Sequence, residues 1–334
     1  MQPLTMLVPL AHIWPGYAPI ALVSALGYDH AEGIQLRNTA VGSPTQALVG
    51  VVDGSGDMTF INTAFGFVAC DGGAPFQMFY AFARRMNRSF ATLADGPIRC
   101  IRDLKGARIA LHFADLLYFA RAALIDEGLD PERDVNFVDW RGPLDEADEM
   151  INAMRGGQIQ AIWQLDLVYG LFAAAGAPLR RLPARTLDHL TPSATVYAHP
   201  RTLADRAPAF GAYGRALAKA TLFTMTNPQA AIRLVWRHVP KTRPAPGDEA
   251  RYLKRDLSVL QSRMENSRPE DAPDKRWGAI TKGEIAAWQK FMLATKAIKT
   301  RRDPSVYFSD ALVDEFNAFD PAAVIAEAKA APNR

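Results

Sequence analysis

The strongest constraint on the fold is an alternation of short apolar runs with segments of helical periodicity, repeated on both sides of Arg88. The strands predicted before Arg88 are Leu4–Val8, Ile34–Leu36, Met58–Ile61 and Phe76–Phe82. The strands predicted after it are Phe90–Leu93, Arg108–Leu111, Val135–Val138, Ala161–Trp163, Leu179–Leu182 and Ala194–Ala198. Strands that alternate with helices at this spacing are typical of an α/β protein with largely parallel sheets.

Helix signals separate these strands and then dominate the last third of the chain. Ser43 suits an N-cap, Pro44 suits the first helical position, and Gln46 completes a capping box. A helix is predicted from Glu249 to Met264, and Thr281-x-x-Glu284 is a second capping box. We therefore expect a helical C-terminal part.

Length and composition exclude several classes of protein. A chain of 334 residues corresponds to about two domains. The sequence has no run of about 18 apolar residues that would span a bilayer. The net charge of +3 produces only a weak electrostatic field around a protein of this size, which argues against nucleic-acid binding. Cys70 and Cys100 are too few for a disulfide scaffold or a four-cysteine zinc site, so we expect two free thiols, with one disulfide as the alternative.

Motifs of catalysis and metal binding are absent from the sequence. It contains neither a Gly-x-Ser-x-Gly elbow nor a phosphate-binding loop, and the six histidines include no pair spaced i, i+4. Gly54 and Gly56 precede a predicted strand, whereas the glycines of a dinucleotide site follow one. We therefore predict no cofactor, no metal and no enzymatic turnover.

Polar and aromatic residues gather directly after predicted strands. Ligands of open α/β sheets bind outside the carboxyl ends of the strands, and a helix N-terminus there favours an anionic group. This rule, together with the predicted strand that carries Tyr80, gives the candidate substrate-binding residues Trp14, Tyr17, Ser43, Asn62, Thr63, Tyr80, His112, Asp115, Trp140, Gln164 and Asp166.

Four stretches of the chain resemble one known family. They are Gly27-Tyr28-x-x-x-Glu32-Gly33-Ile34, Ala47-Leu48-Val49-Gly50-x-x-Asp53-Gly54, Ile101-Arg102-Asp103-Leu104-Lys105-Gly106-Ala107-Arg108-Ile109 and Gly128-Leu129-Asp130-Pro131-x-x-Asp134-Val135. Together and in this order they resemble the substrate-binding proteins of ABC importers of the nitrate/sulfonate/taurine and thiamine-pyrimidine-precursor type. The resemblance covers most of residues 4–240 and returns at 288–320.

The resemblance implies a two-lobe periplasmic-binding-protein-like fold of type II, with two strands that cross between the lobes. These crossings are expected near Tyr80–Arg84 and Thr191–Tyr197. The implied domains are residues 1–84 plus 194–334 for the first lobe and 85–193 for the second. Such a protein is a periplasmic monomer that binds a small molecule and delivers it to the membrane permease of an ABC importer.

Two departures from the family pattern bear on the site and on localisation. Leu165-Asp166-Leu167 stands where the family often has an aromatic-acid-proline triplet. Met1-Gln2-Pro3 leads directly into a predicted strand, so the chain is either cytoplasmic or a mature form whose leader has been replaced by methionine.

The alternative is an enzyme or sensor on the same fold, such as the pyrimidine synthase of thiamine biosynthesis. That enzyme holds pyridoxal phosphate on a lysine of the first lobe and carries a cysteine-rich motif. This chain has no lysine before Lys105, and Cys70 stands alone.

The residue types in the predicted cleft indicate the ligand. Ser43 and the amides after it should hold an anionic or strongly polar group, while Trp14, Tyr80 and Trp140 should cover an apolar or planar part. Asp115 either caps its helix or faces the cleft and favours an amine. Taurine-like zwitterions and aminopyrimidines fit that description, whereas nitrate does not.

Overall fold

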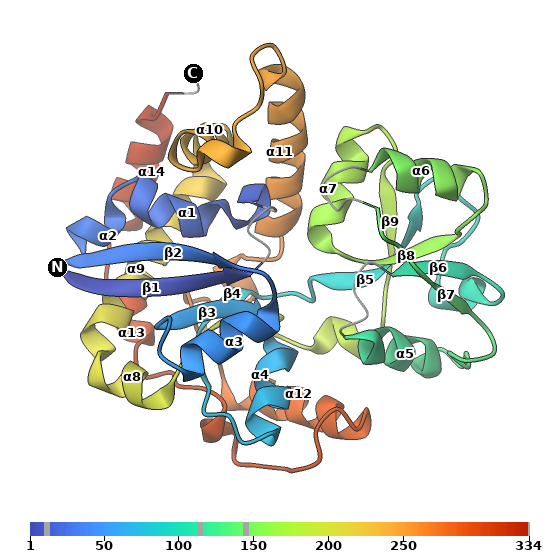
Figure 1. The fold of residues 1–334 in the computed structure, drawn as a ribbon, viewed down its shortest axis with the longest axis horizontal. Helices are drawn as coiled ribbons and strands as arrows, with labels where there is room; N and C mark the ends of the chain where they lie inside the picture. The colour runs from blue at the N-terminus through green and yellow to red at the C-terminus, as the bar shows by residue number, and fades with distance from the viewer. Residues whose placement is uncertain (10–13, 112–115, 143–146, 333–334) are drawn as a thin grey trace.

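The computed structural model describes residues 1–9, 14–111, 116–142 and 147–332, which form two five-stranded sheets (Figure 1). The first sheet has the order β2-β1-β3-β10-β4. Its strands are β1 (Gln2–Pro9), β2 (Ile34–Val41), β3 (Met58–Asn62), β4 (Gln77–Ala83) and β10 (Ala194–Ala198). Strand β1 is parallel to β2 and β3, whereas β10 is antiparallel to both of its neighbours.

The second sheet repeats this arrangement with the order β7-β6-β8-β5-β9. Its strands are β5 (Arg88–Leu93), β6 (Arg108–Leu111), β7 (Asn136–Asp139), β8 (Ala161–Leu165) and β9 (Leu179–Leu182). Strand β6 is parallel to β7 and β8, and β5 is antiparallel to β8 and β9. The predicted α/β fold with two lobes is confirmed. We call each sheet with its helices a lobe.

The chain passes between the lobes twice. It leaves the first sheet after β4 and enters the second at β5, and it returns between β9 and β10. The crossing segments are therefore residues 84–87 and 183–193. The predicted crossings at Tyr80–Arg84 and Thr191–Tyr197 lie too far into the first sheet, because β4 and β10 pair with each other there. The predicted domain boundaries themselves stay predictions.

Helices cover both faces of each sheet (Figure 1). In the first lobe they are η1 (Trp14–Tyr17), α1 (Ala18–Ala25), α2 (Tyr28–Ala31), α3 (Pro44–Val52), α4 (Thr63–Asp71), α8 (Pro200–Asp205), α9 (Ala207–Thr226), α10 (Pro228–His238), η4 (Pro240–Thr242), α11 (Glu249–Met264), η5 (Pro269–Asp271), α12 (Lys282–Ala294), η6 (Pro304–Val306), α13 (Val313–Phe316) and α14 (Pro321–Ala330). In the second lobe they are η2 (Ile101–Leu104), α5 (Leu117–Asp126), α6 (Asp148–Arg155) and α7 (Asp166–Ala174), while η3 (Leu187–His189) lies in the second crossing.

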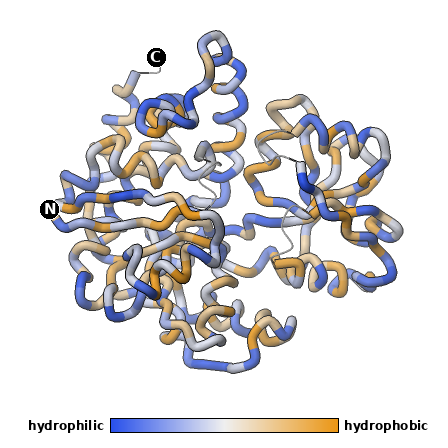
Figure 2. Tube along the Cα trace, viewed as in Figure 1, coloured by the Kyte–Doolittle hydropathy of each residue, from blue (hydrophilic) through white to orange (hydrophobic). Residues whose placement is uncertain are grey.

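Apolar residues concentrate in the central strands and the inner faces of the helices, while the outer turns are hydrophilic (Figure 2). Helix α9 illustrates the pattern, since Phe210, Tyr213 and Leu217 are fully buried at offsets 0, 3 and 7. These offsets place the three side chains on one face of a helix. The predicted helix from Glu249 to Met264 is confirmed as α11.

Two C-terminal helices contribute to the cores of both lobes. In α11, Leu260 and Met264 belong to the first-lobe core, whereas Val259 packs with the second-lobe core around α7. In α12, the Trp288 ring lies 5.8 Å from the Phe119 ring of α5. The stretch from Pro240 to Asp274 thus connects the lobes through α11. This helix packs on the rest of the first lobe with one side and on α7 of the second lobe with the other (Figure 1).

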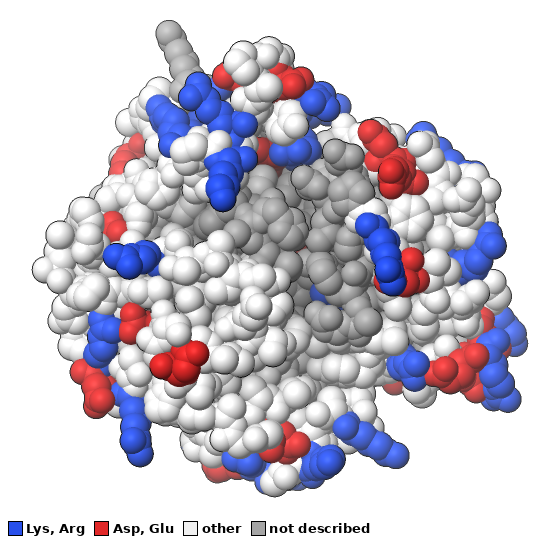
Figure 3. Space-filling view, in the orientation of Figure 1, with Lys and Arg blue, Asp and Glu red and all other residues white. Residues whose placement is uncertain are grey.

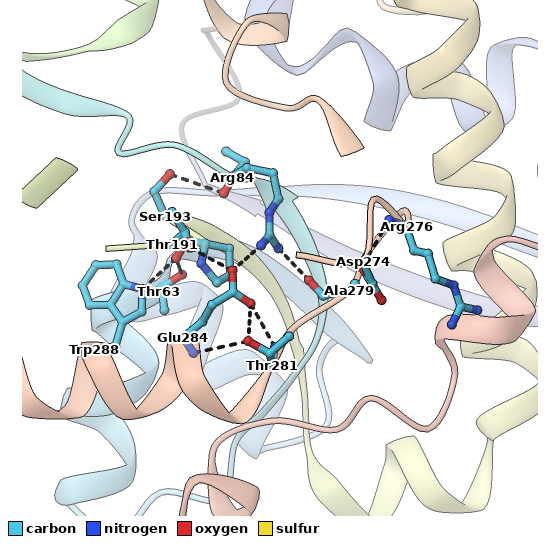
Figure 4. Close-up of polar contacts among 12 residues, drawn as sticks. Thr63, Arg84, Thr191, Ser193, Asp274, Arg276, Ala279, Thr281, Glu284 and Trp288 are labelled. Atoms are coloured by element: carbon cyan, nitrogen blue, oxygen red, sulfur yellow. Dashed lines mark hydrogen bonds and ion pairs between the residues drawn. The ribbon is translucent and has the colours of Figure 1, made fainter. Parts of the chain in front are cut away.

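A buried polar network holds the two crossing segments together (Figure 4). Arg84 of the first crossing forms an ion pair with Glu284 of α12 and donates to Ala279 O at 2.6 Å. Thr191 of the second crossing donates to Glu284 Oε1 at 2.8 Å, so one carboxylate contacts both crossings. Glu284 also forms the predicted capping box with Thr281. The predicted capping box at Gln46 is incomplete, because its Oε1 accepts from Gly42 N instead of from the N-cap amide.

Charged residues of the family-like motifs stabilise the fold. Glu32 accepts hydrogen bonds from Arg215 and Lys219 of α9 at 2.8 and 2.7 Å. Partial burial acts to raise the pKa of Glu32, but these bonds outweigh it and hold the pKa below its usual range. Asp103 accepts from the amides of Arg99 and Cys100.

Substitution of Gly170 tests the contact between the lobes. A Cβ added to Gly170 would lie 2.4 Å from Ser258 O of α11, which is backbone and cannot give way easily. We expect Gly170→Ala to destabilise the protein by roughly 1–3 kcal/mol, measured by chemical denaturation. Gly283→Ala in α12 is the control, because a Cβ there meets only Thr281 Oγ1 at 4.0 Å. Equal stability of the two variants would contradict a tight α7–α11 contact.

Glu32 predicts a pH-dependent contribution to stability. A carboxyl group with a depressed pKa in the folded state stabilises the protein above its unfolded pKa, about 4.3 for glutamate, and loses this effect as the pH falls. We expect Glu32→Gln to lower the melting temperature at pH 7, with the difference shrinking below about pH 4. The exposed Glu265→Gln is the control. A difference that stays constant with pH would refute the role of the charge.

Candidate functional site

A cavity of about 220 Å³ lies between the lobes. Strand ends β1 and β3, the N-terminus of α3, the first crossing and α11 all contribute to it. Its lining comprises Pro9, Tyr17, Gly42, Ser43, Pro44, Phe60, Ile61, Asn62, Phe65, Asn87, Arg88, Leu116, Leu165, Ala194 and Arg263. Tyr17, Ser43 and Asn62 are the predicted site residues that the structure brings together here.

Most of the wall is apolar. The rings of Tyr17 and Phe60 lie 4.9 Å apart, and Phe65 continues the same wall. Leu116 and Leu165 face them from the second lobe. Such a surface suits the apolar body of a small organic ligand, because burying that body removes its apolar surface from water.

Ser43 holds the N-terminus of α3 at one edge of the cavity. Its Oγ accepts from Gln46 N at 3.2 Å, and its carbonyl accepts from Ala47 N at 3.1 Å. The expectation that the amides after Ser43 hold the ligand is therefore wrong for Gln46 and Ala47, because both amides already donate within the helix. The hydroxyl proton of Ser43 and the positive end of the helix dipole can still act on an anion.

Arg263 of α11 is the most unusual group in the lining. Its side chain is only 1% exposed, yet its three guanidinium nitrogens form no hydrogen bond with the described residues. Nη2 lies 2.9 Å from Asp166 Oδ1 as an ion pair, and the guanidinium sits over the Tyr17 ring at 5.3 Å. Because buried N–H donors are costly when unsatisfied, this guanidinium is suited to an anionic ligand.

Arg88 brings a second buried guanidinium to the cavity. It is the first residue of β5, where it pairs with Leu165 of β8, and it is 7% exposed. Asn87 precedes it and accepts from Asn62 Nδ2 at 3.4 Å. Two cations in an apolar cavity attract a negative charge far more strongly than they would in water, because little solvent screens them.

Asp166 balances part of this charge from behind Arg263. Its Oδ1 accepts from Leu167 N at 2.9 Å and its Oδ2 accepts from Asn266 Nδ2 at 2.7 Å. Burial raises the pKa of Asp166 above the usual range, and the nearby Arg263 opposes this shift. Burial likewise raises the pKa of Tyr17, which therefore stays neutral.

Five predicted residues lie outside the cavity lining. Asp166 lies behind Arg263. Thr63 is fully buried, and its hydroxyl donates to Pro192 O of the second crossing at 2.7 Å. Tyr80 packs in the first-lobe core with its ring 5.1 Å from that of Phe316. Gln164 is buried in β8, and Trp140 is half-buried against the second-lobe core. The strand-end rule locates an edge of a sheet, but it does not tell which side chains there point toward the other lobe.

Other predicted residues cannot be placed. His112 and Asp115 lie outside the described residues, as does the side chain of Trp14. Of the residues that sequence reasoning missed, Arg263 carried a signal. Asp256, Val259, Leu260, Arg263 and Met264 follow a helical spacing, and all are buried. Two charged residues within an apolar stripe of a helix indicate a buried polar site.

Basic and acidic side chains are interspersed over the described part of the face seen in Figure 3. Within the described ranges, no helix is long and apolar enough to cross a membrane. The same residues hold no group of three or more side chains arranged to bind a metal ion.

Sequence comparison assigns the chain to a family. The model of the NMT1/THI5-like family matches residues 14–231, more than half of the chain. The chain belongs to the NMT1/THI5-like family. None of the curated proteins matches it in sequence. The matched range covers all of the second sheet and about half of the first lobe, but it leaves out β1 and ends before α11. Arg263 therefore lies outside the part that the family model describes.

Several solved structures have a fold similar to that of this chain. The alkanesulfonate-binding protein SsuA of Xanthomonas axonopodis pv. citri, bound to MOPS, has a TM-score of 0.64 and 14% identity over 93% of this chain and 99% of its own. The periplasmic aliphatic sulphonate binding protein SsuA of Escherichia coli has a TM-score of 0.66 and 14% identity over 93% and 92%. The desulfurization enzyme DSZB has a TM-score of 0.61 and 14% identity over 95% and 99%.

The two cysteines lie away from the cavity and are free, as expected. Cys70 is buried within α4, where burial raises the pKa of its thiol, whereas Cys100 is exposed. We expect one thiol of the NMT1/THI5-like chain to react promptly with a thiol reagent in the native state and both to react after denaturation without reductant. Cys100→Ser should abolish the prompt reaction. Fewer than two thiols in the denatured natural protein would refute the free state.

Proposed function

We propose that this protein binds a small organic anion in the interlobe cavity and delivers it to the permease of an ABC importer. The buried guanidinium of Arg263, with three nitrogens that lack hydrogen-bond partners among the described residues, carries the proposal. Arg88 adds a second positive charge, and the apolar wall of Tyr17, Phe60 and Phe65 suits an organic body. A guanidinium matches sulfonate or carboxylate oxygens through its planar fork.

Among the predicted ligand classes, the cavity favours sulfonates. Two arginines favour a negative head group over a neutral aminopyrimidine. No carboxylate is among the described lining residues, so a taurine-like ammonium group finds no partner there. Two proteins of similar fold, the SsuA proteins of Xanthomonas axonopodis pv. citri and Escherichia coli, are sulfonate-binding proteins, which agrees with this choice.

The place of the protein in the cell follows from the same proposal. A solute-binding protein that serves an importer works outside the cytoplasmic membrane, as a monomer that meets the permease. We propose the domains as residues 1–84 with 194–334, and 85–193. The lobes would clamp the ligand by moving about the crossing segments.

The fold alone does not decide between binding and catalysis, because DSZB has the same fold and is an enzyme. The cavity supports binding, since neither cysteine is among its described lining residues and the polar side chains there are two amides, the hydroxyls of Ser43 and Tyr17, and two guanidinium groups. Mass spectrometry should find benzenesulfonate unchanged after incubation with the protein. Recovery of a product would favour an enzyme.

Calorimetry tests the proposed ligand class and the role of Arg263. Benzenesulfonate should bind more tightly than taurine or 4-amino-2-methylpyrimidine. Arg263→Lys keeps the charge but loses the fork, and should weaken binding of benzenesulfonate by roughly tenfold to a hundredfold.

Arg255→Lys is the matched control for this experiment. Arg255 also lies on α11, pairs with a buried aspartate, Asp256, and sits over a tyrosine ring, but it does not line the cavity. Its affinity should equal that of the natural protein. Equal affinities for all three proteins would remove Arg263 from the site, and no binding of benzenesulfonate to the natural protein would overturn the proposed ligand class.

A further inference from the structure

Leu116 has a backbone conformation that is unusual for a residue of its type. It lines the cavity from the second lobe, is 6% exposed and forms the N-cap of α5. Its φ of 67° and ψ of 18° lie in the left-handed region. A Cβ crowds the backbone in this region, so the conformation is unfavourable for leucine and easy for glycine.

The start of α2 shows the same conformation carried by glycine. Gly27, the N-cap of α2, has a φ of 70° and a ψ of 17°. A Cβ added to Gly27 would meet no atom within 4 Å, so the glycine there answers to the backbone conformation and not to a lack of space. Glycine would serve the backbone equally well at position 116. The leucine therefore strains the chain, and contacts of its side chain must offset that strain.

The surroundings of Leu116 set it apart from the other strained positions. Leu116, Lys275 and Lys296 are the non-glycine residues with a positive φ in the described part of the chain, and both lysines are exposed. Lys296 follows the C-cap of α12, where left-handed residues are common. Leu116 instead precedes a helix, and its side chain caps no backbone group of α5.

The side chain of Leu116 has two environments, the core of the protein and the cavity. It belongs to the same apolar core as Phe119 and Leu124 of α5. On the cavity side, Leu116 and Leu165 are the apolar side chains that the second lobe contributes to the described lining. Leu165 has an extended backbone, with a φ of −70° and a ψ of 152°, and carries no such strain.

We propose that Leu116 is a specificity-determining residue that limits the apolar body of the ligand to about the size of a single ring. This inference rests on the proposed binding of an organic anion in this cavity. The left-handed turn at the start of α5 holds the isobutyl group against the cavity, opposite the wall of Tyr17, Phe60 and Phe65. In a cavity of about 220 Å³, a side chain at this place restricts the space that a second ring would need.

The strain can be tested without a ligand. Leu116→Ala and Leu116→Gly both remove the isobutyl group, but only glycine also relieves the backbone. We expect Leu116→Gly to melt about 2 °C or more above Leu116→Ala. Leu124 in the middle of α5 is the control, because glycine is less stable than alanine inside a helix and the order should be reversed there. An alanine variant at position 116 that is as stable as the glycine variant would contradict the strain.

Benzenesulfonate and 2-naphthalenesulfonate test the limit on size by calorimetry. They share the head group and differ by one fused ring. The natural protein should bind benzenesulfonate more tightly. Leu116→Ala should shift the ratio of the two affinities toward naphthalenesulfonate by about tenfold or more, because small changes in the size of an apolar pocket change discrimination by about tenfold to two-hundredfold. Leu116→Gly should shift the ratio in the same direction, and it replaces the alanine variant if that variant does not fold.

Leu124→Ala is the matched control for binding. Leu124 is a leucine of the same helix and the same apolar core and is fully buried, but it is not among the described lining residues. Its ratio should equal that of the natural protein. If Leu116 served only the core, Leu116→Ala would change both affinities by the same factor. That result, or a natural protein that prefers naphthalenesulfonate, would overturn the inference and leave the proposed function intact. Failure of both sulfonates to bind the natural protein would overturn the two together.

Discussion

The buried ion pair of Arg84 and Glu284 is the interaction on which the arrangement of the lobes depends. Its carboxylate contacts both segments that cross between the sheets, through Arg84 and through Thr191. A buried charge that loses its partner is strongly unfavourable, so neither side chain is easily replaced. Glu284 also forms the capping box with Thr281, and the same carboxylate therefore stabilises the start of α12. The cavity lies next to this network, because Asn87 is the last residue of the first crossing and Arg88 directly follows it. The position of the site thus follows from how the chain crosses.

The α/β character and most strands could be predicted, because the buried face of a strand or helix requires apolar residues at a regular spacing. Strand ends and crossings were less predictable, since they depend on which strands pair. Strand β2 shows this, because it extends to Val41 where the apolar run ends at Leu36. Its later residues are held by the parallel pairing with β1 and not by burial. The family-like motifs proved to be structural, as Glu32 and Asp103 show.

The candidate site could be predicted only in part. Tyr17, Ser43 and Asn62 follow strands and line the cavity. In contrast, the Thr63 hydroxyl donates to Pro192 O, and the Tyr80 ring packs against Phe316 in the first-lobe core. Arg263 comes from a helix about 175 residues further along the chain than Arg88. The tertiary fold brings these two arginines together, and no local pattern in the sequence relates them. The buried stripe of α11 shows that a charged residue is accommodated, yet not what it faces.

The topology of the two sheets also bears on how the chain folds during synthesis. All strands of the second sheet lie in one continuous stretch, from Arg88 to Leu182, whereas the first sheet needs β10 from beyond that stretch. Because domains fold as their residues emerge from the ribosome, the second lobe can form while the first is still missing a central strand. The first lobe closes only after β10, and the cavity is complete only after α11, which carries Arg263, has been made. Synthesis of the last third of the chain is therefore the step that joins the two lobes and completes the cavity between them.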